Sequence, residues 1–478
     1  MSGPDDAGVD NLAQLLLDHP LDGAQPLLST MTSSVTGDEV RRRAGALATE
    51  LREAGIGPGE AVAVQLPNGP DFVIAMMGVW LARAVFVPVN DRLPPTGRDQ
   101  LLEAAGAAAL LDEEGLRRLG GGRAYGPEVA FVTWTSGTTG PPKPILHTHR
   151  SYVELLDRVL GPLRGGGQGD ARPVSPNLIP VSLALNAGIY NVLFGLRAGA
   201  PIVIMEQFAT ADFAELVARF GIRSTVLPPA AITMLNDDPA LPGLAPLRYV
   251  RSITAPLSPF QARRFTERFG AFVLNSYGQA EIGEVIGWTA ADAKEHPEKL
   301  GAAGRPHPGV DVKIAGDDGP VPEGEVGQLF VRPPSMAAGY ADGGELTDRI
   351  DDEGFVATGD LARLDAEGFV WLEGRLGDLI NRGGNKVVPD EVEEVLAASP
   401  TVAEAAVVGV PDERLGEVPV AFVVCRGPLD AEGLGALCRE HLAPYKVPVD
   451  FVAVPRLPRT DVGKILRREL ADGYRPPA

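Results

Sequence analysis

Cysteine and basic residues are both scarce in this sequence, and each scarcity excludes a class of protein. Only two of the 478 residues are cysteine, Cys425 and Cys438. That number supports neither a disulfide framework nor a zinc site, and it suits a reducing cytoplasm. Lys and Arg number 43 against 63 Asp and Glu, which gives a formal net charge of −20. Because so acidic a surface repels phosphate backbones and anionic lipid, we expect neither a nucleic-acid partner nor a membrane partner.

A long uninterrupted hydrophobic run is also missing. The longest apolar stretch covers residues 72–89, and Gly78, Arg83 and Pro88 interrupt it. It therefore indicates a buried helix followed by a strand rather than a membrane span. The first residues lack the basic start and apolar run of a signal peptide, so we expect a cytoplasmic protein.

What the chain does have is an alternation of helical and strand-like segments. Apolar residues recur at helical spacing in 40–54 and 71–84, and short apolar runs at 61–66, 85–89, 129–133, 201–205, 224–227, 249–254 and 271–274 are typical of strands. This alternation predicts βαβ units and therefore an α/β fold with mostly parallel sheets.

The character of the sequence changes near Gly374. Beyond it, residues 402–410 and 418–424 indicate strands, and residues 434–441 and 465–471 indicate short helices. A chain of 478 residues is long enough for two or three domains. We expect a large N-terminal domain of mixed, mostly parallel sheets with helices at 1–376 and a small α+β C-terminal domain at 377–478.

The strongest local signal is a loop rich in glycine and hydroxyl groups. An apolar strand leads into Thr135-Ser136-Gly137-Thr138-Thr139-Gly140-Pro141-Pro142-Lys143. Glycines let the backbone approach a ligand closely, while successive N–H groups, hydroxyls and a lysine make a concave anion site. The loop lacks the Gly-Lys-Ser/Thr ending of the common P-loop, so it predicts a different kind of phosphate site.

Further motifs follow this loop in order. They are Tyr277-Gly278-Gln279-Ala280-Glu281, Ala357-Thr358-Gly359-Asp360, Gly374-Arg375 with Gly383-Gly384-Asn385-Lys386, and Pro458-Arg459-Thr460-Asp461-Val462-Gly463-Lys464. Together with the loop they resemble the ordered motifs of the ANL superfamily of adenylate-forming enzymes, which contains acyl-CoA synthetases, nonribosomal peptide adenylation domains and firefly-type luciferases. The resemblance covers nearly the whole chain.

The resemblance implies an ATP site. The loop from Thr135 to Lys143 would hold the β- and γ-phosphates, and Tyr277 with Gly278 would lie at the adenine, with Asn275 close to its edge. Glu281 would ligate Mg²⁺, a cation that prefers carboxylate oxygen. Asp360 would accept hydrogen bonds from the ribose hydroxyls, and Arg375 would support it.

The resemblance also implies a catalytic lysine on a mobile C-terminal domain. Lys464 would neutralise the charge that develops when the acid's carboxylate attacks the α-phosphorus. In a second orientation of the domain, Gly383 and Gly384 would line a tunnel for a pantetheine thiol. Gly377 would be the hinge, where the superfamily usually has Asp or Lys.

The acid-binding residues are less well defined by the sequence. The resemblance places them at Leu183, Asn186, Ala230, Ile253, Thr254 and Gly283. Two departures stand out: Ala280 replaces a usual Thr, and Ile253-Thr254 replaces a frequent Gly-Gly. Residues 181–186 offer no Asp to pair with a substrate amine, and an unpaired buried ammonium is costly. We therefore expect an apolar acid without an α-amine, either aliphatic or aromatic.

Three functions remain open at this point. The first is an acid–CoA ligase that uses ATP, Mg²⁺ and CoA to convert a small carboxylic acid to its acyl-CoA. The second is an acyl-AMP ligase that transfers the acyl group to the phosphopantetheine of an acyl carrier protein or to an amine. The third is a catalytically weak binding or scaffold protein, against which the presence of Lys464, Glu281 and Asp360 argues. The oligomeric state is not indicated.

Overall fold

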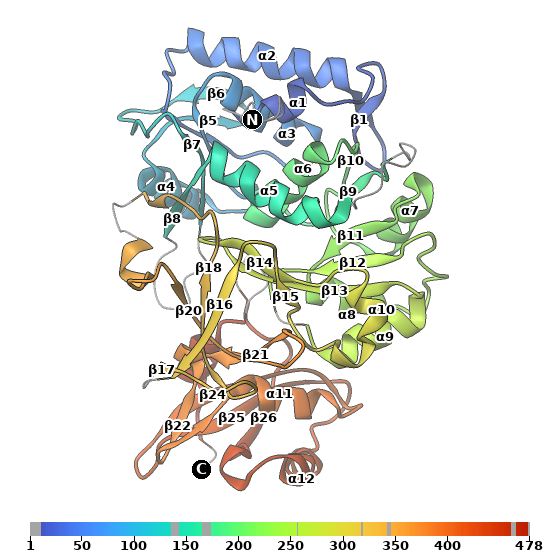
Figure 1. The fold of residues 1–478 in the computed structure, drawn as a ribbon, viewed down its shortest axis with the longest axis vertical. Helices are drawn as coiled ribbons and strands as arrows, with labels where there is room; N and C mark the ends of the chain where they lie inside the picture. Colours follow the sequence, from blue (N-terminus) through green and yellow to red (C-terminus); the bar gives the residue numbers. More distant parts are fainter. Residues whose placement is uncertain are drawn as a thin grey trace.

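The computed structural model describes residues 11–134, 143–164, 174–255, 257–316, 319–341, 346–459 and 465–476. The chain forms two large sheets separated by helices, then an antiparallel sheet, then a C-terminal sheet at the far end of the long axis (Figure 1). This architecture confirms the predicted α/β class, with a large N-terminal domain of mixed sheets and a smaller C-terminal domain.

One large sheet has seven strands in the order β19-β8-β7-β4-β3-β5-β6. Its central strands pair in parallel, and its edge strands pair antiparallel. The central strands are almost fully buried, which explains why they are continuous apolar runs. The strands are β3 (Ala61–Val64), β4 (Val85–Pro88), β5 (Ala107–Asp112), β6 (Gly115–Arg118), β7 (Val129–Trp134), β8 (Pro144–Thr148) and β19 (Gly339–Tyr340).

The second large sheet has nine strands in the order β15-β14-β13-β12-β11-β9-β10-β1-β2. The strands from β13 to β1 run parallel, and β2, β14 and β15 are antiparallel additions at the two edges. The strands are β1 (Pro26–Ser29), β2 (Ser34–Thr36), β9 (Asn177–Ile179), β10 (Ile202–Ile204), β11 (Ser224–Leu227), β12 (Tyr249–Ser252), β13 (Phe272–Gln279), β14 (Gly283–Gly287) and β15 (Arg305–Pro306).

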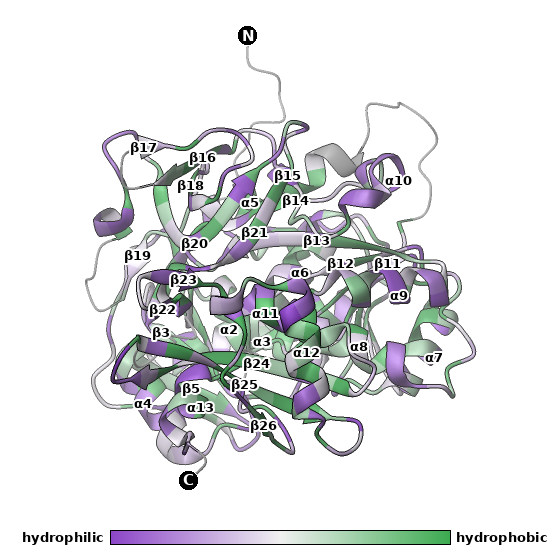
Figure 2. Ribbon diagram, turned by 90° about the horizontal axis from the view of Figure 1, so that it is seen from below, coloured by the Kyte–Doolittle hydropathy of each residue, from purple (hydrophilic) through white to green (hydrophobic). Residues whose placement is uncertain are grey.

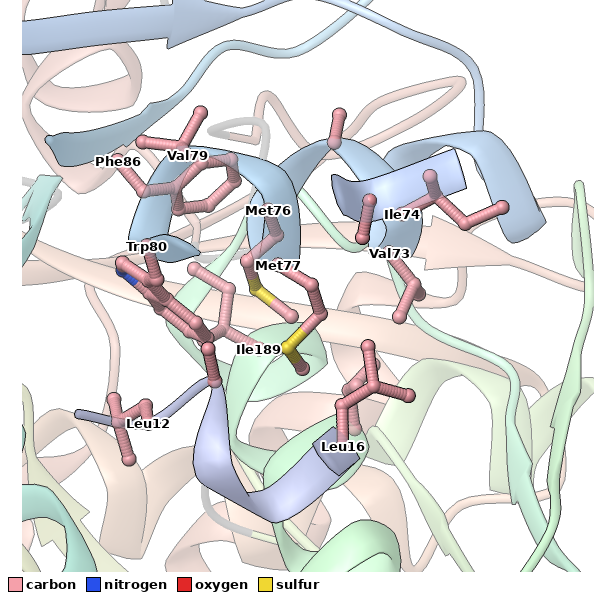
Figure 3. Packing of buried hydrophobic residues seen from close by; sticks show 14 of the residues in the cluster. Leu12, Leu16, Val73, Ile74, Met76, Met77, Val79, Trp80, Phe86 and Ile189 are labelled. Carbon is pink, nitrogen blue, oxygen red and sulfur yellow. The ribbon is translucent and has the colours of Figure 1, made fainter. Parts of the chain in front are cut away.

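Helix α3 (Pro70–Leu81) is the centre of the largest apolar core. Nearly every residue from Phe72 to Trp80 is buried, as its continuous hydrophobic sequence requires. Figure 3 shows Met76, Met77 and Trp80 of α3 packed beside Leu12 and Leu16 from the N-terminal segment and Ile189 of helix α6 (Asn186–Arg197). The buried indole N–H of Trp80 is satisfied, because it donates to the carbonyl of Ala130 at 2.7 Å.

The helices lie between and around these sheets. Those of the N-terminal region are α1 (Gln14–Leu17), α2 (Gly37–Glu53), α3 (Pro70–Leu81), α4 (Pro95–Ala105), α5 (His149–Arg164), α6 (Asn186–Arg197), α7 (Thr210–Phe220), α8 (Pro229–Asp237), α9 (Pro259–Phe269) and α10 (Asp292–Glu295). In the parts of the chain that the structure describes, no helix is both long enough and apolar enough to cross a membrane.

A five-stranded antiparallel sheet follows, which the sequence did not predict. Two of its strands, β18 (Gly327–Arg332) and β20 (Val356–Leu364), alternate buried and more exposed residues and so contain no long continuous apolar run. Its order is β17-β16-β18-β20-β21, with β16 (Asp311–Gly316), β17 (Gly319–Pro320), β18 (Gly327–Arg332), β20 (Val356–Leu364) and β21 (Val370–Arg375).

The C-terminal sheet is built on one long antiparallel hairpin, β24 with β25, which carries the two predicted strands. In Figure 2 this hairpin is mainly hydrophobic, whereas α7 and α9 show hydrophilic residues. The elements are β22 (Ile380–Arg382), β23 (Asn385–Val387), β24 (Val402–Asp412), β25 (Gly416–Cys425), β26 (Asp450–Ala453), α11 (Pro389–Ala397), α12 (Ala431–His441) and α13 (Arg467–Gly473).

Candidate functional site

Residues predicted to bind the adenine and the ribose meet where the nine-stranded and antiparallel sheets approach each other. Tyr277 lies on β13, Asp360 on β20, and Arg375 at the end of β21, directly opposite Asp360 in the strand register. Asp360 is only 8% exposed. A carboxylate so deeply buried requires hydrogen-bond donors.

Three side chains supply those donors. The Tyr277 hydroxyl donates to Oδ2 of Asp360 at 2.6 Å, the Gln279 amide donates to the same oxygen at 3.0 Å, and Arg375 Nε donates to Oδ1 at 2.8 Å. Burial, with the neighbouring carboxylate, raises the pKa of Tyr277 well above its usual value, so the phenol keeps the proton that it donates. We call these four residues the Asp360 array.

Gln279 and Arg349 belong to this site although neither was predicted for it. Gln279 lies inside the motif at residues 277–281, so the motif offered a signal for its role in the site. Arg349 stood in no motif, and only the fold shows that its guanidinium lies between Gln279 Oε1 at 2.9 Å and Glu281 Oε1 at 3.2 Å. It also donates to the carbonyl of Ala357, which fixes it against β20.

Glu281, the predicted metal ligand, is 7% exposed and lies beside the array. Its Oε1 accepts from Arg349 and from the hydroxyl of Tyr340 at 3.2 Å. The other oxygen, Oε2, has no hydrogen-bond partner among the residues that the structure describes. Lys143 Nζ lies 5.5 Å from the centre of the Tyr340 ring, so the fold brings the last residue of the predicted phosphate loop to the same place as Glu281.

The remaining loop residues, Thr135 to Gly140, and the predicted catalytic Lys464 lie outside the described residues. The flanking strands nevertheless fix the ends of the loop, because Trp134 of β7 pairs with Pro144 of β8. At the other end of the chain, Arg467 follows Lys464 by three positions. It donates to Asp390 at 2.9 Å and also to Glu393, which ties this segment to α11.

Gly278 of β13 packs against the backbone of Gly283 in β14. A Cβ on Gly278 would lie 2.1 Å from the carbonyl oxygen of Gly283. Gly283 itself has φ of +67°, and a Cβ there would lie 2.8 Å from the Leu155 side chain. Both positions therefore require glycine for local packing, apart from any role in binding.

Asn275 has an unsatisfied acceptor. Its side-chain amide donates to the carbonyls of Ala302 at 3.1 Å and Leu300 at 3.3 Å. Its Oδ1 is buried without a partner in the described parts of the chain. A buried acceptor of this kind is uncommon and indicates a place for a donor such as an amino group.

Two of the predicted acid-binding residues, Asn186 and Gly283, line one cavity together with Ala280, Tyr152 and Arg158. We call it the Arg158 cavity. Its Tyr152 hydroxyl donates to Asn186 Oδ1 at 2.9 Å. Arg158, on α5, was not predicted from the sequence.

The other four predicted acid-binding residues do not line this cavity. Leu183 is buried in the largest apolar core, Ile253 is half-buried, and Ala230 and Thr254 are exposed. Thr254 has φ of +76°, which a β-branched residue rarely adopts and which glycine adopts freely.

In the C-terminal sheet, Gly383 and Gly384 form the turn between β22 and β23. Their φ angles are +57° and +90°, so the turn itself favours glycine at both places. Gly377 lies in a single 3₁₀ turn, Leu376–Asp378, and apart from its two chain neighbours no residue has an atom within 4 Å of where its Cβ would be. That Gly377 is the hinge remains a prediction. That Gly383 and Gly384 line the pantetheine tunnel remains a prediction as well.

Comparison with known proteins now assigns the family. A model described as AMP-binding enzyme matches residues 23–121 and 123–341, and one described as AMP-binding enzyme C-terminal domain matches residues 391–464. The chain belongs to the AMP-binding enzyme family, within the adenylate-forming superfamily that its motifs resemble. All six predicted acid-binding positions and Glu281 fall in the first match, and Lys464 is the last residue of the second.

Relatives extend the similarity over nearly the whole enzyme. The sulfoacetate–CoA ligase of Cupriavidus necator is 32% identical, over 89% of this chain and 90% of that protein. The feruloyl-CoA synthase of an Amycolatopsis species is also 32% identical, over 92% and 94%. The solved structure of o-succinylbenzoate CoA synthetase from Bacillus subtilis, in complex with its acyl-adenylate, is 26% identical, with a TM-score of 0.85 over 98% of this chain and 99% of that one.

Proposed function

We propose that the enzyme is an acid–CoA ligase. In the first step an oxygen of the acid's carboxylate bonds to the α-phosphorus of ATP, and pyrophosphate leaves. In the second step the CoA thiol loses its proton and its sulfur bonds to the acyl carbon, and AMP leaves. The observation that carries the proposal is the Asp360 array beside Glu281, because it places a ribose acceptor next to a phosphate site.

The array suits a ribose for a specific reason. A carboxylate has about four acceptor positions, and three donors already use three of them. The remaining position on Oδ1 is available to a ribose hydroxyl, while Tyr277, Gln279 and Arg375 hold the carboxylate in place. The unsatisfied Oδ1 of Asn275, on the same strand as Tyr277, would accept from the adenine amino group.

A magnesium ion fits the residues at Glu281. Among the described residues no cluster of three or more acidic, His or Cys side chains could hold a metal by itself. Mg²⁺ commonly binds one or two carboxylates together with substrate phosphates. Glu281 has one oxygen without a partner in the described structure, and it would hold the ion against the phosphates, where the ion neutralises their charge.

Two lysines would complete the charge balance. Lys143 lies beside Tyr340 and Glu281, where it would bind the outgoing pyrophosphate. Lys464 would approach the α-phosphate, where the acid's anion and the phosphate's developing charge must be brought together. The family relationship and the CoA-dependent names of the relatives support CoA as the acceptor. The acids in those names differ, so they do not define the acid here.

The first test is pyrophosphate exchange with ATP, measured over a panel of aliphatic, aromatic and dicarboxylic acids. We expect exchange that depends on both the acid and Mg²⁺. An enzyme that binds ATP yet exchanges with no acid of the panel would overturn adenylation.

The second test supplies the acceptor. Acids that support exchange are incubated with CoA, with a phosphopantetheinylated carrier protein, or with an amine, and the products are separated by mass. We expect acyl-CoA. Exchange without acyl-CoA, but with acylated carrier protein or amide, would replace the CoA ligase by the acyl-AMP ligase described above.

A further inference from the structure

Arg158 is a buried cation whose charge is not matched by hydrogen-bond partners. The residue is 8% exposed. Its Nη2 reaches the Ser335 hydroxyl only at 3.5 Å, while Nε and Nη1 are buried with no hydrogen-bond partner in the described parts of the chain. Burial lowers the pKa of Arg158, although Tyr190, Glu284 and Glu154 act in the opposite direction. Burying a charge without partners is costly, so a ligand that supplies acceptors would offset a real loss of stability.

No neighbouring carboxylate in the described structure forms an ion pair with Arg158. Glu284 is the nearest buried carboxylate, and Arg251 and His307 both contact its Oε1. Tyr190 donates to its other oxygen at 3.4 Å. Two guanidinium groups therefore face one carboxylate, which is already bonded elsewhere. Glu154, one turn before Arg158, is half-exposed and binds Arg150.

The Arg158 cavity borders the guanidinium but has a volume of only about 10 Å³ in this structure, so it would have to widen to admit an anion. No carboxylate lines it among the described residues, and its other polar groups are engaged. Tyr152 binds Asn186, and the His147 ring binds Thr133 at 2.8 Å. Burial lowers the pKa of His147 to about 3, so that ring is neutral near pH 7. Arg158 is then the charged group that the described part of the cavity presents.

The Arg158 cavity adjoins Glu281, the predicted metal ligand. Ala280 and Gly283 line it, and Glu281 lies between them in the sequence. Glu281 turns away toward Tyr340 and Arg349, whereas Arg158 lies on the side of Tyr190 and Glu284. An acid whose carboxylate faces the phosphates beside Glu281 would therefore extend its far end toward Arg158.

We infer that the acid substrate carries a second anionic group at its far end, a carboxylate or a sulfonate, and that Arg158 binds it. The inference rests on the proposed function and identifies the class of acid. It differs from the apolar acid expected from the sequence alone. A guanidinium presents several N–H groups in one plane, which match the oxygens of such an anion.

The test compares acids that differ only at the far end. The pairs are succinate with butyrate, glutarate with pentanoate, and terephthalate with 4-methylbenzoate, and 3-sulfopropanoate is compared with butyrate. In pyrophosphate exchange we expect the wild-type enzyme to prefer the doubly anionic member of at least one pair by about 100-fold in kcat/KM, since a site built for a charged group rejects its apolar analogue.

Arg158→Met should abolish that preference by lowering kcat/KM for the doubly anionic acid about 100-fold, while the methyl acid stays within about threefold of wild type. Arg158→Lys, which keeps the charge, should recover part of the loss. Arg150→Met is the matched control, because it removes an exposed arginine of the same helix and should alter neither acid. In thermal unfolding Arg158→Met should not be less stable than wild type, and it should lose the shift that the doubly anionic acid with a non-hydrolysable ATP analogue gives the wild type.

Three outcomes would overturn the inference while adenylation stands. Equal losses for both members of a pair would place Arg158 at the reacting carboxylate or in the fold. A wild-type preference for the methyl acids would exclude a second anion, and so would a kcat/KM in Arg158→Met that equals wild type for every acid. If the wild type exchanges with no acid at all, the proposed function fails as well.

Discussion

The Asp360 array and the Arg158 cavity lie in the same N-terminal domain and differ in how their polar groups are paired. In the array, the carboxylate receives donors from Tyr277, Gln279 and Arg375 before any ligand binds. In the cavity, Arg158 has two nitrogens without partners in the described structure. In the array, protein donors already hold the carboxylate and leave one acceptor position for a ligand, whereas the buried nitrogens of Arg158 need a ligand to supply their acceptors.

This difference corresponds to the two tasks of the site. A nucleotide that is common to every turnover is best bound by groups that are already held in position, because no reorganisation is then needed. The acid must be distinguished from similar acids, and a buried charge that only one class can satisfy provides such discrimination. Changes in the array should therefore affect all acids alike, whereas changes in the cavity should alter their ranking.

The largest effect is expected at the centre of the array. Asp360→Asn keeps the shape of the side chain but removes the charge that Arg375 and the ribose would bind. We expect kcat/KM for ATP to fall about 10³-fold, as when one partner of a buried charge pair is removed. The fall should be the same for every acid in steady-state assays.

Glu373→Gln is the control for this change, because it alters a partly exposed ion pair with Arg363 on the same pair of strands. Its activity should match wild type. If Asp360→Asn changed the ranking of acids instead of lowering all of them, the array and the cavity would not be separate in function.

Lys464 tests whether the comparison extends to the C-terminal domain. Lys464→Ala should lower acyl-AMP formation about 10²–10³-fold, because it removes one positioned electrostatic contact. Thioester formation from supplied acyl-AMP should remain close to wild type if the domain rotates between the steps. Single-turnover kinetics of each step measure this directly.

Arg468→Ala is the matched control for Lys464, since Arg468 is a highly exposed cation at the start of α13. Both steps should be normal in it. Equal loss of both steps in Lys464→Ala would contradict the rotation and indicate a lysine needed for folding.

Glu281 should give a smaller and metal-dependent effect. Glu281→Gln removes the anionic ligand while leaving an acceptor for Tyr340, so we expect about a 10- to 100-fold loss at low Mg²⁺. Part of the loss should disappear as Mg²⁺ is raised. An Mg²⁺ titration that overlays that of the wild type would exclude Glu281 from the metal site.

The sequence predicted the regular elements and most of the Asp360 array, but it did not predict the Arg158 cavity. Residues 224–227 were predicted as a strand and form β11 with the same bounds, because the β-branched Thr225 and Val226 favour a strand and three of its four residues are buried. Helix α2 was predicted from residue 40, but it begins at Gly37 because Thr36 caps it through its side chain. Motifs identified three residues of the array, Tyr277, Asp360 and Arg375, but did not assign a role to Gln279.

The cavity could not be predicted in this way. Arg158 lies in a helix with charged residues around it and has the appearance of a solvated side chain. Its burial depends on the packing of α5 against the elements that carry Tyr190 and Glu284, which local periodicity does not encode. The one available signal was its spacing, three residues after the buried Leu155 and one before the buried Val159.

The smallest effect is expected outside both regions, at Thr254. This exposed residue has φ of +76°, in a place where the superfamily frequently has glycine. A non-glycine residue held there costs on the order of 1–3 kcal/mol, while glycine adds about 0.5–1 kcal/mol of backbone entropy to the unfolded chain. Thr254→Gly should therefore raise the free energy of unfolding by about 1 kcal/mol in urea denaturation, with an unchanged ranking of acids because Thr254 does not line the Arg158 cavity. Thr254→Ala keeps a Cβ and removes only the branch, so it should relieve less of the backbone strain and raise the free energy of unfolding by less. A stability that falls in Thr254→Gly would show that the Thr254 side chain makes contacts that outweigh its strain, and a changed ranking of acids would extend the acid site beyond the Arg158 cavity.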